Sequence, residues 1–234
     1  MGFPYQPRLV SMVRKIEDDL QQYYQLNLLA STADHLITRA EAESLDGQPL
    51  ESKSRAAVVM QTHGEDAFVG IVLDERLIEQ LVSDSPTQYL HNGNLDPFCA
   101  LAEEISHFHL ITQRLDQGRG VSRIELEWQA EMDKMIICAA TLERQSGDPH
   151  ILPLIRCLFD QSSILADQDR LSYEEANRVA GRLWHALSDQ IARIGLRETA
   201  GQLQNLLRTT YHHPWQEKCE AVEDFRISLS RLAA

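Results

Sequence analysis

Acidic side chains and a histidine recur at helical spacing in the middle of the chain. Glu103 and His107 are four positions apart, and Glu104 lies three positions before His107. Side chains three or four residues apart project from one face of a helix, so these groups can converge on one ion. Glu127 and Glu131 repeat the four-residue spacing further along. Carboxylate and imidazole donors in this number can bind zinc, iron or manganese.

The helix expected to carry the first acids is apolar on nearly all sides. One face combines Phe98, Leu101, Ala102, Ile105, Phe108 and Leu115, and the opposite side carries Ala100, Leu110 and Ile111. A helix of this kind is buried. Buried carboxylates are costly unless they are paired, hydrogen-bonded or bound to metal. We therefore expect Glu103, Glu104 and His107 to have partners.

The same residues also have purely structural interpretations. Glu127 follows Arg123 by four positions, and Glu131 precedes Lys134 by three, so each acid has a basic partner at helical spacing. The two acids before His107 lie in the N-terminal half of their helix, where the helix dipole favours negative charge. His107 itself can be a hydrogen-bonded core residue. Both interpretations stay open on the sequence.

Two successive helices are expected to position these residues. Asp96 followed by Pro97 is a typical helix start, and this helix should run to about Leu115. A glycine-bearing loop over 116–120 follows. The sequence Ser122-Arg123-Ile124-Glu125 is a capping box that starts the next helix, which should continue to about Arg144.

The rest of the chain predicts an α+β, predominantly helical fold, with a small β-sheet beside the helix pair. The patterns predict, in chain order, helices over 8–30 and 33–45, a hairpin of strands 56–60 and 67–73 connected through 63–66, a helix over 76–82 capped by Asp74, an irregular stretch over 83–96, and three or four helices over 150–234 with breaks near Gly195 and Pro214. Residues 1–150 would form the α+β domain and 151–234 a helical C-terminal region, or both one continuous domain.

Composition narrows the function classes. The formal net charge is −13, which repels phosphate backbones, so we expect no nucleic-acid partner. The scatter of Arg193, Arg197 and Arg208 is better explained as a solvated helix face. No apolar stretch approaches 18 residues and the N-terminus lacks a signal-peptide pattern, which favours a cytoplasmic protein with no membrane span.

Cysteines and the remaining histidines give weaker signals. The four cysteines are widely spaced and predict buried thiols instead of a disulfide framework or zinc ribbon; they are Cys99, Cys138, Cys157 and Cys219. His109 and His185 are expected to pack at the core or its boundary. The pair His212-His213 before Pro214 is expected to be a surface turn, with metal binding as the alternative. Glu104-x-x-His107 also matches di-iron carboxylate bundles, but the chain has no second ExxH.

The sequence Glu103-Glu104-Ile105-Ser106-His107 resembles the HExxH motif of zinc metallopeptidases of the gluzincin class, similar to thermolysin. In that class a glutamate on the next helix is the third ligand, and Glu127 follows His107 by twenty residues, a spacing the class uses. Here glutamate replaces the first histidine, which makes the donor set more negative and harder. The resemblance covers residues 56–134.

The resemblance implies that Glu103, His107 and Glu127 bind a divalent metal, with zinc as the first candidate, and that Glu104 is the general base. Glu131 or Asp133 would hold His107 in its tautomer. The first hypothesis is therefore a divergent zincin-like metal-dependent hydrolase acting on a protein or peptide. The second is a non-catalytic zincin-like or helical scaffold that acts through protein–protein contacts. The sequence does not predict the oligomeric state.

Overall fold

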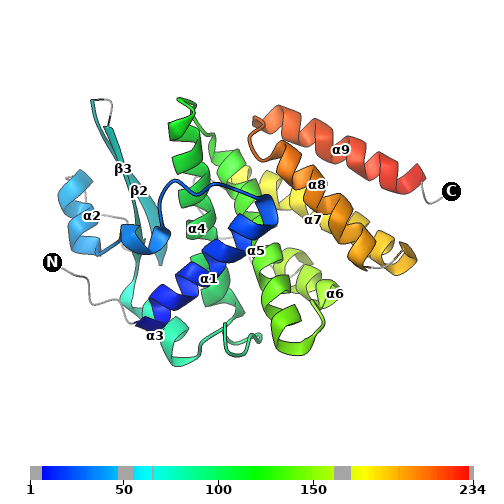
Figure 1. The fold of residues 1–234 in the computed structure, drawn as a ribbon, viewed down its shortest axis with the longest axis horizontal. Helices are drawn as coiled ribbons and strands as arrows, with labels where there is room; N and C mark the ends of the chain where they lie inside the picture. The colour runs from blue at the N-terminus through cyan, green and yellow to red at the C-terminus, as the bar shows by residue number, and fades with distance from the viewer. Residues whose placement is uncertain (1–6, 47–54, 65, 161–169, 195, 232–234) are drawn as a thin grey trace.

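The protein is described by a computed structural model over residues 7–46, 55–64, 66–160, 170–194 and 196–231 (Figure 1). Its elements in chain order are α1 (Pro7–Tyr24), the 3-10 helix η1 (Thr32–His35), β1 (Leu36–Ile37), α2 (Arg39–Asp46), β2 (Ala56–His63), β3 (Asp66–Leu73), α3 (Glu75–Ser83), α4 (Leu95–Asp116), α5 (Arg123–Ser146), α6 (Ile151–Ile155), the π-helical turn η2 (Arg156–Asp160), α7 (Arg170–Ile194), α8 (Leu196–Thr210) and α9 (Trp215–Arg231). The predicted α+β, predominantly helical fold is confirmed.

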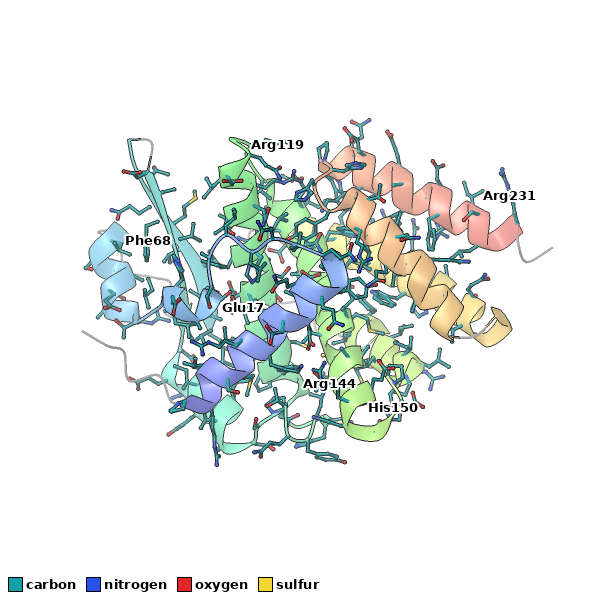
Figure 2. All side chains as sticks on the ribbon, in the orientation of Figure 1. Glu17, Phe68, Arg119, Arg144, His150 and Arg231 are labelled. Carbon is teal, nitrogen blue, oxygen red and sulfur yellow. The ribbon has the colours of Figure 1, made fainter. Side chains whose placement is uncertain are left out.

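The small sheet lies at one side of the molecule, with α2 and α4 on either side of it (Figure 1). Strands β2 and β3 form the predicted hairpin, which extends in register from Ala56 opposite Leu73 to His63 opposite Asp66. Gly64 in the connecting turn has a φ of 65°, a conformation that glycine adopts without steric cost. Residues 69–73 of β3, the part near α3, are buried, and residues 66–68 at the other end, which include Phe68 (Figure 2), are exposed. The sheet therefore joins the core through one end of the hairpin.

The predicted helix over 33–45 is wrong. Its sequence divides into η1, the short strand β1 and α2. Leu36 and Ile37 pair in parallel with Ile71 and Val72 of β3, and this pairing keeps them extended. The backbone N–H of Glu41 then donates to the Thr38 hydroxyl at the start of α2. A long-range sheet contact has overridden the local helical pattern.

The helix predicted over 8–30 begins as expected but is shorter. It ends at Tyr24, and Gln25 has a φ of 56°, which is left-handed and stops the helix. The apolar face predicted for it is buried, from Leu9 to Leu20. Asp74 caps α3 as predicted, by accepting from the backbone N–H of Leu77 at 2.6 Å.

Helices α4 and α5 form a central antiparallel pair, and α1, α3, α6 and α7 pack against one or both of them (Figure 1). The capping box at Ser122 and Glu125 is confirmed, with both reciprocal hydrogen bonds present. The prediction that Asp96 caps α4 is wrong: the helix begins at Leu95, after Asn94. A turn over 91–94 starts it early, because the Asn94 carbonyl already accepts from Phe98. Asp96 instead forms an ion pair with Arg55 at 2.6 Å.

Of the C-terminal helices, α6 and α7 pack against α5, and α8 and α9 pack against α7 and against each other. One cluster of buried apolar side chains runs from Leu9 in α1 to Leu229 in α9. The division into regions 1–150 and 151–234 stays a prediction. A break near Pro214 is confirmed by the turn between α8 and α9, whereas Gly195 lies outside the described residues. Within the described chain, no helix combines the length and the apolar character needed to cross a bilayer.

The predicted solvated basic face is wrong for Arg208. Its side chain donates to the backbone carbonyls of Tyr23 and Gln22 at 2.7 and 3.2 Å and fastens α8 to the end of α1. These carbonyls lack helical partners at the end of α1, which is where a guanidinium is a favourable donor. The side chains of Arg193 and Arg197 lie outside the described residues.

Candidate metal centre

The three predicted ligands come together between α4 and α5. Glu103 and His107 lie one turn apart on α4, and Glu127 lies on α5. One ligand atom from each residue can be chosen so that all three atoms lie within 4.8 Å of one another. His107 and Glu127 are buried, and Glu103 is half-buried. The antiparallel packing of the two helices thus produces the convergence that the spacing predicted.

His107 is the residue whose surroundings most need an explanation. The residue is 8% exposed, and its Nε2 atom is buried with no hydrogen-bond partner among the described residues. Its Nδ1 atom lies 3.7 Å from Oε2 of Glu104. Burial alone would lower the pKa of His107, but the carboxylates of Glu104, Glu103 and Glu127 outweigh it and raise the pKa. A buried imidazole nitrogen without a partner in the protein leaves its hydrogen-bonding or ligand position to a water molecule or an ion.

Two basic side chains partly neutralise the cluster. Lys134 Nζ lies 3.0 Å from Glu103 Oε2 and 2.8 Å from Glu131 Oε1. Arg123 Nε donates to Glu127 Oε1 at 2.6 Å. The ion pairs predicted from helical spacing, Arg123 with Glu127 and Lys134 with Glu131, are therefore present. Burial alone would raise the pKa of Glu103, but the Lys134 ammonium lowers it, whereas burial raises the pKa of Glu127.

These ion pairs do not balance the charge of the cluster. Among the described residues it contains four carboxylates, those of Glu103, Glu104, Glu127 and Glu131, against the two permanent positive charges of Lys134 and Arg123. Isolated negative charge is expensive in a buried setting. Protonation of His107, whose pKa the carboxylates raise, would supply one further positive charge, and a divalent cation bound to the neutral ring would supply two.

The predicted roles of Glu131 and Asp133 beside His107 are wrong. Glu131 pairs with Lys134. Asp133 accepts from the hydroxyls of Tyr24 and Ser106, at 2.5 and 2.6 Å. Residues on α5 turn by about 100° per position, so these two acids face different neighbours from each other. The acid that lies beside His107 is Glu104, on the same helix.

A second buried polar network lies across α5, and sequence reasoning missed it. Gln129 donates to both Tyr24 and Asp133, and its side-chain carbonyl accepts from Lys218 of α9 at 3.1 Å. Lys218 is fully buried, with its ammonium 4.9 Å from the centre of the Trp128 ring. Burial raises the pKa of Asp133 to about 6 and lowers the pKa of Lys218 to about 7. No spacing rule connects residues this far apart in sequence.

Tyr173 of α7 is another residue near the cluster that the sequence did not indicate. The ammonium of Lys134 lies 5.9 Å from the centre of its ring. Burial is the main cause that raises the pKa of Tyr173, and the charge of Glu131 adds to it, so the hydroxyl keeps its proton and can donate. The C-terminal region therefore contributes a polar side chain next to the cluster.

His109 and His185, which were both predicted to pack at the core or its boundary, differ in burial. His109 is a core residue as predicted: its Nε2 lies 3.2 Å from the Thr32 hydroxyl and 3.6 Å from Glu17, which is labelled on α1 in Figure 2, and burial lowers its pKa to about 4. The prediction for His185 is wrong, because its side chain faces outward from α7 and is exposed.

His212 and His213 occupy the turn between α8 and α9, as predicted. The His212 carbonyl accepts from Arg114 and from Arg119, at 2.5 and 3.0 Å; Arg119 is labelled in Figure 2 near the end of α4. The turn is therefore held by its backbone. A groove of about 220 Å³ between α7 and α9 contains none of the cluster residues. Its Arg178 and Arg226 form ion pairs with acids of their own helices.

Comparison with known proteins gives no match: no protein-family model, no curated protein and no solved structure is similar to this chain. The gluzincin-like motif stays a hypothesis that depends on the residues and on the geometry of the cluster.

Replacement of Lys134 by methionine tests whether the cluster depends on internal charge compensation. We expect Lys134→Met to lower the free energy of unfolding of the metal-free protein by about 3 kcal/mol, because Glu131 and Glu103 lose their partner. Urea denaturation measures the change. Lys15→Met is the control: it removes a 43%-exposed side chain 3.7 Å from Asp19, an acid that Arg144 still contacts, and should cost less than about 0.5 kcal/mol. Equal effects in the two variants would contradict the expectation.

The buried Lys218 predicts a pH dependence of stability. Above about pH 7 the folded chain holds this amine neutral, whereas the unfolded chain keeps the proton until its ordinary pKa of 10.5. The unfolded state therefore binds more protons, and stability rises with pH between 7 and 9. Relative to Lys218→Met, we expect the slope to approach about 1.4 kcal/mol per pH unit. Parallel profiles from denaturant titrations would refute this.

Proposed function

We propose that Glu103, His107 and Glu127 bind one divalent metal ion, and that the protein is a metal-dependent hydrolase acting on an amide or ester bond of a protein or peptide. The observation that carries the proposal is buried His107, which has an unpartnered Nε2 and offers a ring nitrogen within 4.8 Å of oxygen atoms of Glu103 and Glu127. The excess of negative charge around it supports the same conclusion.

The donor set suits zinc, manganese or iron. Bonds of 2.0–2.2 Å to one ion place its ligand atoms about 3–3.5 Å apart. The three atoms here lie within 4.8 Å, so small side-chain rotations would bring them onto one ion. Glu103 is the ligand that is more exposed than the other two, which gives an ion a way in from solvent. Two carboxylates with one imidazole do not select strongly among these metals.

A divalent ion bound here would act as a Lewis acid toward a carbonyl and would acidify a water molecule. The chain contributes the base: Glu104 lies next to the proposed ligands and is proposed to accept the proton of the attacking water. Its contact with His107 Nδ1 also orients the ring, so that Nε2 presents its lone pair. The Tyr173 hydroxyl is a donor near the cluster.

The alternative function is a non-catalytic scaffold that acts through protein partners. The observation that favours it is the set of ion pairs made by Lys134 and Arg123, which gives three of the acids, Glu103, Glu127 and Glu131, partners without any metal. In this function the cluster only fixes α4 against α5.

Metal content separates the two functions. We expect the purified protein, incubated with Zn²⁺, Mn²⁺ or Fe²⁺ and desalted, to retain about one equivalent of metal by elemental mass spectrometry. His107→Ala should lose it, because the variant removes the only nitrogen ligand of the set. His185→Ala, which removes an exposed histidine of α7, is the matched control and should retain it. A metal-free native protein would leave the scaffold as the better account.

Glu104→Gln separates a base from a residue that only orients His107. For a base, we expect metal affinity to change less than about threefold while peptide hydrolysis by the metal-loaded protein falls by a factor of about 10² or more. A loss of metal affinity of 10-fold to 100-fold would instead assign Glu104 to holding the imidazole. Calorimetric metal titration and a peptide-library cleavage assay provide the two readouts.

A further inference from the structure

Two cysteines face each other across the α4–α5 interface. Cys99 is one turn before Glu103 on α4, and Cys138 is one turn after Lys134 on α5. Their Sγ atoms lie 3.9 Å apart, and both are free thiols. A disulfide bond is about 2.05 Å long. The two sulfur atoms are therefore already in contact, and bond formation requires them to approach by about 1.9 Å.

The surroundings of the two thiols differ. Cys138 is buried, whereas Cys99 is half-buried and can be reached from solvent. The prediction of buried thiols is therefore confirmed for Cys138 alone, since Cys157 and Cys219 are also half-buried. The hydrogen bond with Cys99 and burial raise the pKa of Cys138, and the Lys134 ammonium opposes them.

We propose that Cys99 and Cys138 form a reversible disulfide when the protein meets a two-electron oxidant such as hydrogen peroxide. The Cys99 thiolate attacks one peroxide oxygen, the O–O bond breaks, and Cys99 becomes a sulfenic acid as hydroxide leaves. The sulfur of Cys138 then attacks that of Cys99. The S–O bond breaks, the S–S bond forms, and the departing hydroxide takes the Cys138 proton as water. The two sulfur atoms supply the two electrons.

This bond would fasten together the two helices that carry the acidic cluster. It would close the loop between residues 99 and 138, which includes the α4–α5 connection, and would restrict the unfolded chain. It forms whether or not a metal binds, so the proposal is independent of the proposed function. Disulfides are rare in reducing compartments, where such a bond is a transient, redox-sensitive one.

Peroxide treatment of the reduced full-length chain tests the proposal. We expect the free thiol count to fall from four to two, the intact mass to fall by two hydrogen atoms, and peptide mapping to find a single cross-link between Cys99 and Cys138. Dithiothreitol should restore four thiols. The urea midpoint of the oxidised protein should rise, and Cys219→Ala should show the same cross-link and the same rise.

Two variants test the order of the steps. Cys138→Ala should form no cross-link and should accumulate a sulfenic acid on Cys99 that dimedone traps, whereas Cys99→Ala should form neither. The proposal is overturned if the native chain keeps four thiols under oxidant that converts a reference dithiol, or if the cross-link involves Cys157 or Cys219.

Discussion

Charge buried between α4 and α5 is the constraint around which this protein is organised. These helices place four carboxylates and a histidine in their interface, and such groups persist there only with compensation. Lys134 and Arg123 provide part of it from the chain itself. The remaining negative charge and the unpartnered nitrogen of His107 are the features that apolar packing does not explain.

Helix α5 connects this cluster to the rest of the molecule. Most of its length is buried, although much of its sequence is polar. On one side it pairs with α4 through Lys134. On another, Asp133 and Gln129 connect it to Tyr24 of α1 and to Lys218 of α9. Each partner supplies hydrogen bonds that offset the desolvation of the polar groups, so the polar side chains of α5 specify which elements pack around it.

The same cluster supports both the metal-site and the scaffold functions, and the difference lies in how its charge is balanced. Lys134 donates to Glu103, and Arg123 donates to Glu127. An ion would use the oxygen atoms that these cations leave free. Glu103 is more exposed than the other two candidate ligands, and Lys134 already contacts its carboxylate. A bound metal ion would therefore share this carboxylate with the Lys134 ammonium.

The sequence alone determined the local features: the helix pair, the capping box at Ser122, the hairpin, and Glu103, His107 and Glu127 as the residues able to converge. Helical spacing and capping depend on residues that are close in sequence, so the sequence alone predicts them. The tertiary structure alone decided that residues 36–37 form a strand on β3, that Lys134 reaches Glu103 as well as Glu131, and that Lys218 is buried. Spacing specifies which side chains share one face of a helix. Which element covers that face, and so which charges lose water and which find partners, depends on packing between distant segments.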